Sequence, residues 1–288
     1  MAESCKGGGR KRENGNCTNP DPVDGFPVQC VGPWAVHKHD YLERYIDATR
    51  QVRKRYLEPV GRGGSAFIDL FAGPGRARIN INGTIIDGSP MIALKHTAAP
   101  FSRVVVCDKD PENAAALKQR TAVYGERAVV VPGDCHEQID RIIEKIPKYG
   151  LNLALVDPFS LEQLKYETLA KLGTFERMDM LIHFPTGDAK RNHVQGAVRR
   201  LANATGSTRV QEIVRKPSDT VKAIAELRAS LEKLGYTGFE TRTAPITNSK
   251  NVLLYHLVYV SKDEKGDEIW NSVVRTTATR QRSLPGFA

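Results

Sequence analysis

Apolar residues along this chain form two kinds of pattern that alternate with each other. Short continuous apolar runs, each the length of a buried strand, occupy 66–70, 104–108, 128–131, 152–157 and 178–184. Helical periodicity fills the stretches between them, at about 89–98, 111–123, 136–146 and 161–172. Strands that are apolar throughout and alternate with helices are typical of a parallel sheet covered on both faces. The pattern therefore predicts an α/β, Rossmann-like fold with a mostly parallel sheet and helices on both faces.

Further elements are expected on either side of this alternating region. Helical patterns cover 34–58, between two prolines, and 217–234. Strand patterns at 237–244 and 252–261 are close enough in sequence to pair as an antiparallel hairpin. With this hairpin the predicted sheet has seven strands and ends in an antiparallel C-terminal strand.

The two ends of the chain differ in composition from the rest. Residues 1–32 are rich in Gly, Asn, Pro, Lys and Arg, with little apolar content, and are expected to form a flexible basic tail. The stretch 276–288 is expected to form a basic C-terminal tail. The Rossmann-like domain is thus predicted to span 33–275, with a basic insert at 186–216.

A glycine turn follows the first predicted strand, in the sequence Asp-Leu-Phe-Ala-Gly-Pro-Gly at 69–75. In a doubly wound sheet, ligands bind at the carboxyl ends of the strands. Glycines in such a turn let the backbone approach a ligand without a Cβ in the way. The residues of this turn that are expected to contact a cofactor are Asp69, Phe71, Ala72, Gly73 and Gly75.

Acidic residues also stand at the ends of the second and third strands. Asp108, with Lys109 beside it, lies where Rossmann folds place an acid that accepts from ribose hydroxyls. Asp110 precedes Pro111 and is expected to cap the next helix. Gly133 and Asp134 end the third strand, and Asp134 either accepts from an adenine amino group or only caps helix 136–146.

The fourth strand ends in Asp157-Pro158-Phe159. This sequence is similar to the substrate-side motif of amino-group methyltransferases, in which the polar residue and the proline carbonyl hold the amine and the aromatic stacks on a base. Asp157, Pro158 and Phe159 are therefore the predicted catalytic residues, and a plain turn into the next helix is the alternative. Those enzymes typically have two prolines, whereas Phe159 takes the place of the second one here.

A basic stretch follows the fifth strand. Residues 187–216 hold Lys190, Arg191, Arg199, Arg200, Arg209, Arg215 and Lys216 against Asp188 and Glu212. Such charges either contact phosphates or form a solvated helix face. The predicted substrate contacts are Arg76, Asp188, Lys190 and Arg191. His183, inside the strand, is expected to be a core histidine rather than a base.

Residues 78–87, directly after the glycine turn, have the pattern of a β-hairpin around Asn82-Gly83. The next helix is expected to start at Gly88-Ser89-Pro90, with Ser89 as its cap. The hairpin either covers the cofactor or moves the helix away from it.

Composition narrows the setting of the protein. A net charge of +9 favours polyanionic partners such as nucleic acid. No apolar run is long enough to cross a bilayer, no signal peptide is apparent, and the five cysteines are an odd number. These features favour reduced thiols, a cytoplasmic location and no membrane association. The spacing of Cys5, Cys17 and Cys30 is not that of a zinc site, so no metal is predicted.

Taken together, segment 69–75, Asp108, Gly133-Asp134 and Asp157-Pro158-Phe159 resemble class I methyltransferases that use S-adenosylmethionine (SAM). More narrowly, the chain resembles the three-Cys-motif partner protein family over about 33–272. This narrower resemblance rests on further segments: Trp34 with Lys38-His39, 67–76, Gly88-Ser89-Pro90 with 92–94, Phe184-Pro185, 255–257, Ser261-Lys262 and 269–271. It implies a methyltransferase-like fold, SAM as cofactor, and a separately encoded three-Cys-motif protein as a possible partner.

Two functions follow from this resemblance. The first is a SAM-dependent methyltransferase acting on a nucleic-acid amino group, with Asp157 orienting the amine. The second is a non-catalytic partner subunit of a three-Cys-motif enzyme, which the single proline and the interrupted glycine loop favour. A dinucleotide oxidoreductase is less favoured, because Arg78 stands where its glycine motif needs a small residue.

Overall fold

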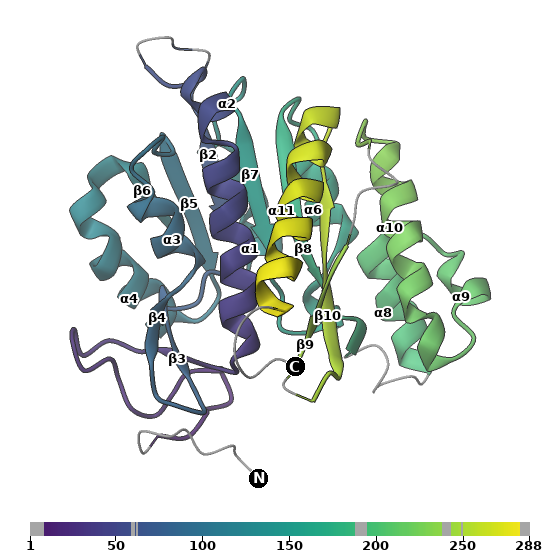
Figure 1. The fold of residues 1–288 in the computed structure, drawn as a ribbon, viewed down its shortest axis with the longest axis horizontal. Helices are drawn as coiled ribbons and strands as arrows, with labels where there is room; N and C mark the ends of the chain where they lie inside the picture. Colours follow the sequence, from purple (N-terminus) through teal and green to yellow (C-terminus); the bar gives the residue numbers. More distant parts are fainter. Residues whose placement is uncertain are drawn as a thin grey trace. The chain divides into compact units, whose positions relative to one another are not determined.

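The computed structural model describes residues 9–58, 61, 63–187, 195–237, 243–248 and 250–282. The chain divides into two compact units, Met1–Gly150 and Leu151–Ala288. Figure 1 shows the helices and strands of both units along the chain. No helix within the described ranges is both long and apolar enough to span a bilayer.

The first unit is built around three parallel strands. They are β2 (Ala66–Asp69), β5 (Arg103–Asp108) and β6 (Ala128–Pro132), in the order β6-β5-β2. The helical segments of this unit are α1 (Trp34–Ala48), α2 (Arg50–Lys54), α3 (Ser89–Lys95), α4 (Pro111–Thr121), the 3-10 helix η1 (Ala122–Arg127) and α5 (Cys135–Ile143). Phe67, Ile68 and Val105 are fully buried, as expected for strands covered on both faces.

The second unit contains two parallel strands followed by an antiparallel pair. β7 (Asn152–Val156) pairs in parallel with β8 (Met178–Phe184), and β10 (Leu253–Val260) pairs antiparallel with both β8 and β9 (Ala244–Thr247). Its helical segments are η2 (Leu161–Gln163), α6 (Tyr166–Leu172), α8 (Gln195–Thr205), α9 (Val210–Ile213), η3 (Pro217–Val221), α10 (Lys222–Glu232) and α11 (Glu264–Arg282).

The hydrogen-bonded strand order is β6-β5-β2-β7-β8-β10-β9. Its first five strands follow the order of a Rossmann-like sheet, and the antiparallel strands come at the C-terminal end. This order confirms the predicted Rossmann-like class I methyltransferase fold with seven strands. The pattern at 237–244 corresponds to a strand that begins later, at Ala244, while residues 238–242 lie outside the described part of the chain.

A second, three-stranded sheet lies in the first unit. Its strands are β1 (Gln29–Val31), β3 (Arg76–Ile79) and β4 (Ile85–Asp87), with β3 and β4 antiparallel. The β3–β4 pair confirms the predicted hairpin, and Gly83 in its turn has φ +78°.

Residues 9–32 differ from the flexible tail that their composition predicts. They carry strand β1 and pack Cys17, Val28 and Cys30 into a small buried cluster together with Ile85. Several polar side chains of this segment bond to residues about a hundred positions further along the chain. We refer to residues 9–32 as the N-terminal segment.

Helix α11 occupies residues that we expected to lie partly in a basic tail. Trp270, Val273, Val274 and Thr277 of this helix are buried and recur at helical spacing. Trp270 stacks on Tyr259 of β10, with ring centroids 5.3 Å apart. The helix is therefore held by an apolar stripe within the second unit.

Candidate functional site

The glycine turn after β2 is held by the fully buried carboxylate of Asp69. Phe71 N donates to Asp69 Oδ1 at 3.1 Å, and Ser89 Oγ donates to Asp69 Oδ2 at 2.5 Å. The cap of α3 is Gly88 rather than the predicted Ser89, because the Ser89 hydroxyl is engaged by Asp69. Asp69 thus fixes the turn from both sides.

Gly73 and Gly75 both have positive φ, +60° and +86°, which explains the need for glycine at these positions. Gly88 N donates to the Gly75 carbonyl at 2.9 Å. The hairpin between them therefore leaves the chain and returns to the same point. Because α3 begins directly after Gly88, the hairpin does not move this helix away from the glycine turn.

Asp108 at the end of β5 is the centre of the hydrogen bonding around this turn. Gly73 N donates to Asp108 Oδ2 at 2.8 Å, and Asp110 N and Asn113 Nδ2 donate to Asp108 Oδ1 at 2.9 and 3.0 Å. Burial raises the pKa of the Asp108 carboxyl, and these hydrogen bonds act in the opposite direction. The structure thus brings two predicted cofactor residues, Gly73 and Asp108, into direct contact.

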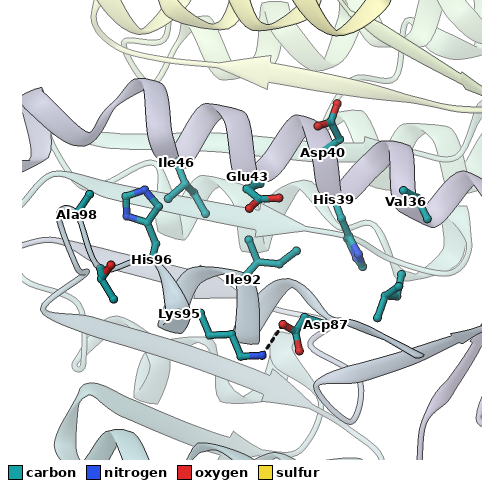
Figure 2. Close-up of a pocket in the computed structure, with 12 residues that line it drawn as sticks. Val36, His39, Asp40, Glu43, Ile46, Asp87, Ile92, Lys95, His96 and Ala98 are labelled. Atoms are coloured by element: carbon teal, nitrogen blue, oxygen red, sulfur yellow. Dashed lines mark hydrogen bonds and ion pairs between the residues drawn. The ribbon is translucent and has the colours of Figure 1, made fainter. Parts of the chain in front are cut away.

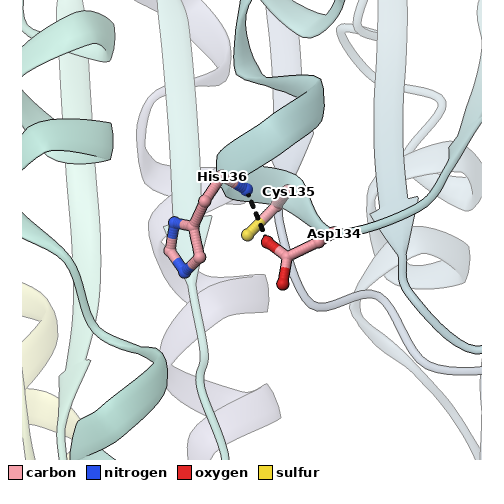
Figure 3. Close-up of side chains that lie close together, drawn as sticks. All are labelled: Asp134, Cys135 and His136. Atoms are coloured by element: carbon pink, nitrogen blue, oxygen red, sulfur yellow. Dashed lines mark hydrogen bonds between the residues drawn. The ribbon is translucent and has the colours of Figure 1, made fainter.

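The other strand-end acids of the first unit cap helices. Asp110 accepts from Glu112 N and Asn113 N at the start of α4, as predicted. Asp134 accepts from His136 N at the start of α5, and Figure 3 shows this contact. The ring of Phe71, another predicted cofactor residue, lies edge-on to His136 at 6.3 Å. The capping interpretation of Asp134 therefore holds, and its contact with adenine stays a prediction.

Asp134, Cys135 and His136 each offer one atom that can ligate a metal, and these atoms lie within 4.8 Å of one another. Structural zinc sites usually take four ligands from separate parts of the chain, whereas these three residues are consecutive. The cluster offers three of the four ligands that a structural zinc site takes, and Asp134 and His136 are joined by the hydrogen bond that begins α5.

Cys107 is the nearest thiol to Asp108, and burial raises its pKa to about 12. Its Sγ donates to the Gly133 carbonyl at 3.2 Å. A thiol that stays protonated and buried is a poor nucleophile. Cys107 is therefore not a candidate nucleophile, and its side chain packs at the strand end.

The second unit places three polar side chains together at the ends of β7, β8 and β10. Asp157 Oδ1 lies 2.7 Å from His183 Nδ1, and the rings of His183 and Tyr255 lie 3.7 Å apart. Burial, with a contribution from Asp157, raises the pKa of Tyr255 well above its ordinary value. His183 is thus largely buried and hydrogen-bonded, as expected for a core histidine, and its partner is the strand-end carboxylate of Asp157.

Phe159, two residues beyond Asp157, is 55% exposed. Its backbone N donates to Gln163 Oε1 at 2.9 Å, which holds the turn that carries it. The Phe159 ring is therefore accessible, and its stacking on a base stays a prediction. Pro158, between them, is buried.

The other predicted contact residues that the structure describes are paired elsewhere or exposed. Arg76 pairs with Asp21 at 2.9 Å in the N-terminal segment, and Lys109 is exposed. Asp188, Lys190 and Arg191 lie outside the described residues. In the described part of the basic insert, Arg200 and Arg209 lie 3.8 and 3.7 Å from glutamates.

A cavity of about 570 Å³ opens between α1, β4 and α3. Figure 2 shows His39, Asp40 and Glu43 on one side of it and the Asp87–Lys95 ion pair on the other. Gly73, Asp108 and Asp134 are not among the residues that line it. The cavity is therefore distinct from the strand-end residues that we predict to bind a cofactor.

The sequence analysis missed the residues of the N-terminal segment that contact the strand-end acids of the first unit. Asn16 is fully buried, and its Nδ2 donates to Asn113 Oδ1 at 2.7 Å. Asn14 Nδ2 donates to Asp110 Oδ2 at 2.8 Å. A periodic pattern in the sequence could not have predicted these contacts, because the partners are nearly a hundred positions apart.

Comparison with known proteins gives distant structural likenesses. A Legionella pneumophila protein of the family DUF519 superposes with a TM-score of 0.49 at 12% identity, covering 87% of this chain and 92% of that chain. TYW2 from M. jannaschii, in complex with AdoMet, gives 0.42 at 11%, covering 87% and 86%. A geranyl diphosphate methyltransferase in complex with GPP and sinefungin gives 0.36 at 15%, covering 84% and 92%. At such distances these likenesses carry no conclusion about what this chain binds.

No model of a protein family matches the chain, and no curated protein matches it either. The resemblance to the three-Cys-motif partner family therefore stays a prediction. The fold itself rests on the strand order and the strand directions described above.

Proposed function

We propose that the protein is a SAM-dependent methyltransferase that acts on an amino group of a nucleic acid. The observation that carries the proposal is the hydrogen bond between Gly73 N and Asp108 Oδ2, which joins the glycine turn to the strand-end acid. Backbone close to a ligand and an acid for ribose hydroxyls are the two features by which Rossmann-like folds bind nucleosides.

The types of residue at this site are suited to binding SAM. Gly73 and Gly75 give a turn free of Cβ atoms, and the Asp108 carboxylate has capacity for a further donor beyond the three that it accepts. Asp69 would support the methionine end through the turn, and Asp134 would lie at adenine. SAM, when bound, supplies an activated methyl group on a sulfonium.

Residues of the second unit would bind and orient the methyl acceptor. Phe159 would stack on a nucleic-acid base, and Asp157 would orient the amine and His183. With Nδ1 held by Asp157, Nε2 is the nitrogen of His183 that would take the proton lost by the methylated amine. The positive net charge supports a polyanionic acceptor.

Methyl transfer can be measured directly with SAM carrying a radioactive methyl group, using total RNA and, separately, genomic DNA as acceptors. Asp157→Asn and His183→Gln are expected to lower transfer by about 10²- to 10⁴-fold, the usual contribution of a positioned acid–base group. Glu162→Gln, an exposed acid in the same turn region, is the matched control and should leave transfer unchanged.

If Asp157→Asn and His183→Gln leave transfer intact, their assignment is wrong. If the chain alone transfers no methyl group to either acceptor, but does so with a separately encoded partner, the partner-subunit function is favoured instead.

A further inference from the structure

The N-terminal segment packs against the part of the first unit that we propose to bind SAM. Gln29 Oε1 lies 3.4 Å from the point where a Cβ on Gly73 would stand. Arg120 of α4 donates to the Pro74 carbonyl in the glycine turn and to both carboxylate oxygens of Asp24 in the segment. The segment is therefore fixed beside the glycine turn by contacts at several points.

A chain of side-chain amides connects this segment to Asp108. The Asp108 carboxylate accepts from Asn113 Nδ2, so the Asn113 amide must turn its Oδ1 the other way. Asn113 Oδ1 then accepts from Asn16 Nδ2. The orientation of the Asn16 amide is thus set by the charge on Asp108.

This orientation leaves one buried acceptor without a partner. Asn16 is fully buried, and its Oδ1 makes no hydrogen bond. Buried polar atoms in folded proteins are nearly always paired, so an exception calls for an explanation, such as a ligand that the site takes up. Asn16 Oδ1 can accept a hydrogen bond from a hydroxyl or an amino group.

The capacity of Asp108 indicates which donor is needed. A carboxylate offers about four acceptor positions, and Asp108 already accepts from Gly73, Asp110 and Asn113. It therefore has room for about one ribose hydroxyl, while a ribose presents two. Asn16 Oδ1 is the buried acceptor on the adjoining amide chain.

We propose that the N-terminal segment completes the nucleoside site, with Asn16 Oδ1 accepting from a ribose hydroxyl of the bound cofactor. This inference rests on the proposed function, since it assumes that the first unit binds SAM. The segment then forms one wall of the site, and ligand binding stabilises its packed position by linkage.

The test uses the full chain and S-adenosylhomocysteine, together with its 2′-deoxy and 3′-deoxy analogues, in calorimetric titrations. Asn16→Ala is expected to weaken binding of the parent ligand about tenfold, the effect of one lost hydrogen bond in a buried site. One deoxy analogue should bind wild type about tenfold more weakly, yet bind Asn16→Ala and wild type equally. Thr18→Ala is the matched control, because Thr18 lies exposed in the same segment and its Oγ1 accepts from Arg10 N, away from the amide chain.

A second measurement shows whether the segment is in place. The Cys17 thiol is buried in the segment, so its alkylation rate reports opening. At one fixed, saturating concentration, S-adenosylhomocysteine should slow Cys17 alkylation in wild type. It should slow the alkylation about tenfold less in Asn16→Ala, each protein being compared with itself without ligand.

Each other outcome overturns the inference. If Asn16→Ala binds as wild type does, or still discriminates against the same deoxy analogue, Asn16 is not the acceptor. If the ligand speeds Cys17 alkylation, the segment competes with the ligand and does not complete the site. If wild type binds no ligand, the proposed cofactor site fails and this inference fails with it, whereas the first two results leave that site intact.

Discussion

Arg120 of α4 joins the N-terminal segment to the glycine turn. Its side chain is only 4% exposed. It donates to Asp24 Oδ2 and Oδ1 at 2.7 and 2.8 Å, and to the carbonyls of Pro27 and Pro74 at 2.8 and 2.6 Å. Substitution by Met keeps the length of the stem and removes the charge and every donor.

The cost of Arg120→Met can be worked from these contacts. Removing one partner of a buried ion pair costs about 3–5 kcal/mol, mostly because the other charge is left unpaired. The Asp24 carboxylate is 24% exposed and can recover part of its hydration, so the lower end of that range applies. A loss of about 3 kcal/mol raises the population of the opened segment about a hundredfold.

Thiol alkylation measures this opening residue by residue. Cys17 and Cys30 are 2% and 4% exposed and belong to the N-terminal segment and its cluster, whereas Cys107 lies in β5. When opening and closing are fast relative to labelling, the labelling rate follows the opened population. Arg120→Met should therefore speed alkylation of Cys17 and Cys30 about a hundredfold while leaving Cys107 protected.

The matched control is Lys118→Met, an exposed position on the same helix. It should leave all three rates unchanged. The reasoning is refuted if Arg120→Met leaves the Cys17 rate within a fewfold of wild type. It is also refuted if the Cys107 rate rises in step, since the whole unit would then be opening.

Two further predictions concern stability. Hydrogen bonding to Arg120 holds the pKa of Asp24 below its ordinary value, so the ionised Asp24 carboxylate stabilises the segment at neutral pH and this contribution is lost as the pH falls through the lowered pKa. Hydrogen exchange over residues 9–32, corrected for its intrinsic pH dependence, should therefore accelerate below about pH 4 in wild type. The same acceleration in Asp24→Asn would contradict the assignment of this pH dependence to Asp24. Trp270 is fully buried against Tyr259, so Trp270→Ala should lower the free energy of unfolding by about 3–5 kcal/mol in urea titrations, and a loss below about 1 kcal/mol would show that α11 is not anchored by this ring.

The strands were predictable because a parallel strand buried on both faces leaves a continuous apolar run in the sequence. The runs at 104–108 and 178–184 correspond closely to β5 and β8. The hairpin was predictable because Asn82-Gly83 is a strong turn signal. The sequence did not predict that the chain returns after the hairpin to the glycine turn. Only the structure shows the hydrogen bond from Gly88 to Gly75.

The N-terminal segment was not predictable from local pattern. Its packing depends on polar contacts such as Asn16 to Asn113, whose partners are 97 residues apart. Composition correctly reports that the segment has few apolar residues, yet a cluster as small as Cys17, Val28 and Cys30, together with buried ion pairs, is sufficient to hold it.

The acid–imidazole pair shows a similar limit. Asp157 was identified from its place at a strand end, whereas His183 was interpreted as a core residue rather than a base. Only the pairing of β7 with β8 brings the two side chains within 2.7 Å. Helix α11 is a different case. Its buried residues recur at helical spacing in the sequence, but the many charged residues between them led us to expect a tail; the buried residues are Trp270, Val273, Val274 and Thr277.

The central claim, that the first unit binds SAM through Asp108, is tested most directly by calorimetric titration of SAM into three forms of the full chain. Wild type should bind at micromolar concentrations, and Asp108→Asn should bind at least tenfold more weakly, because a hydroxyl loses an ionised acceptor. Asp110→Asn should bind as wild type does, since asparagine caps α4 equally well. Absence of binding by wild type, or equal binding by Asp108→Asn, would contradict the claim.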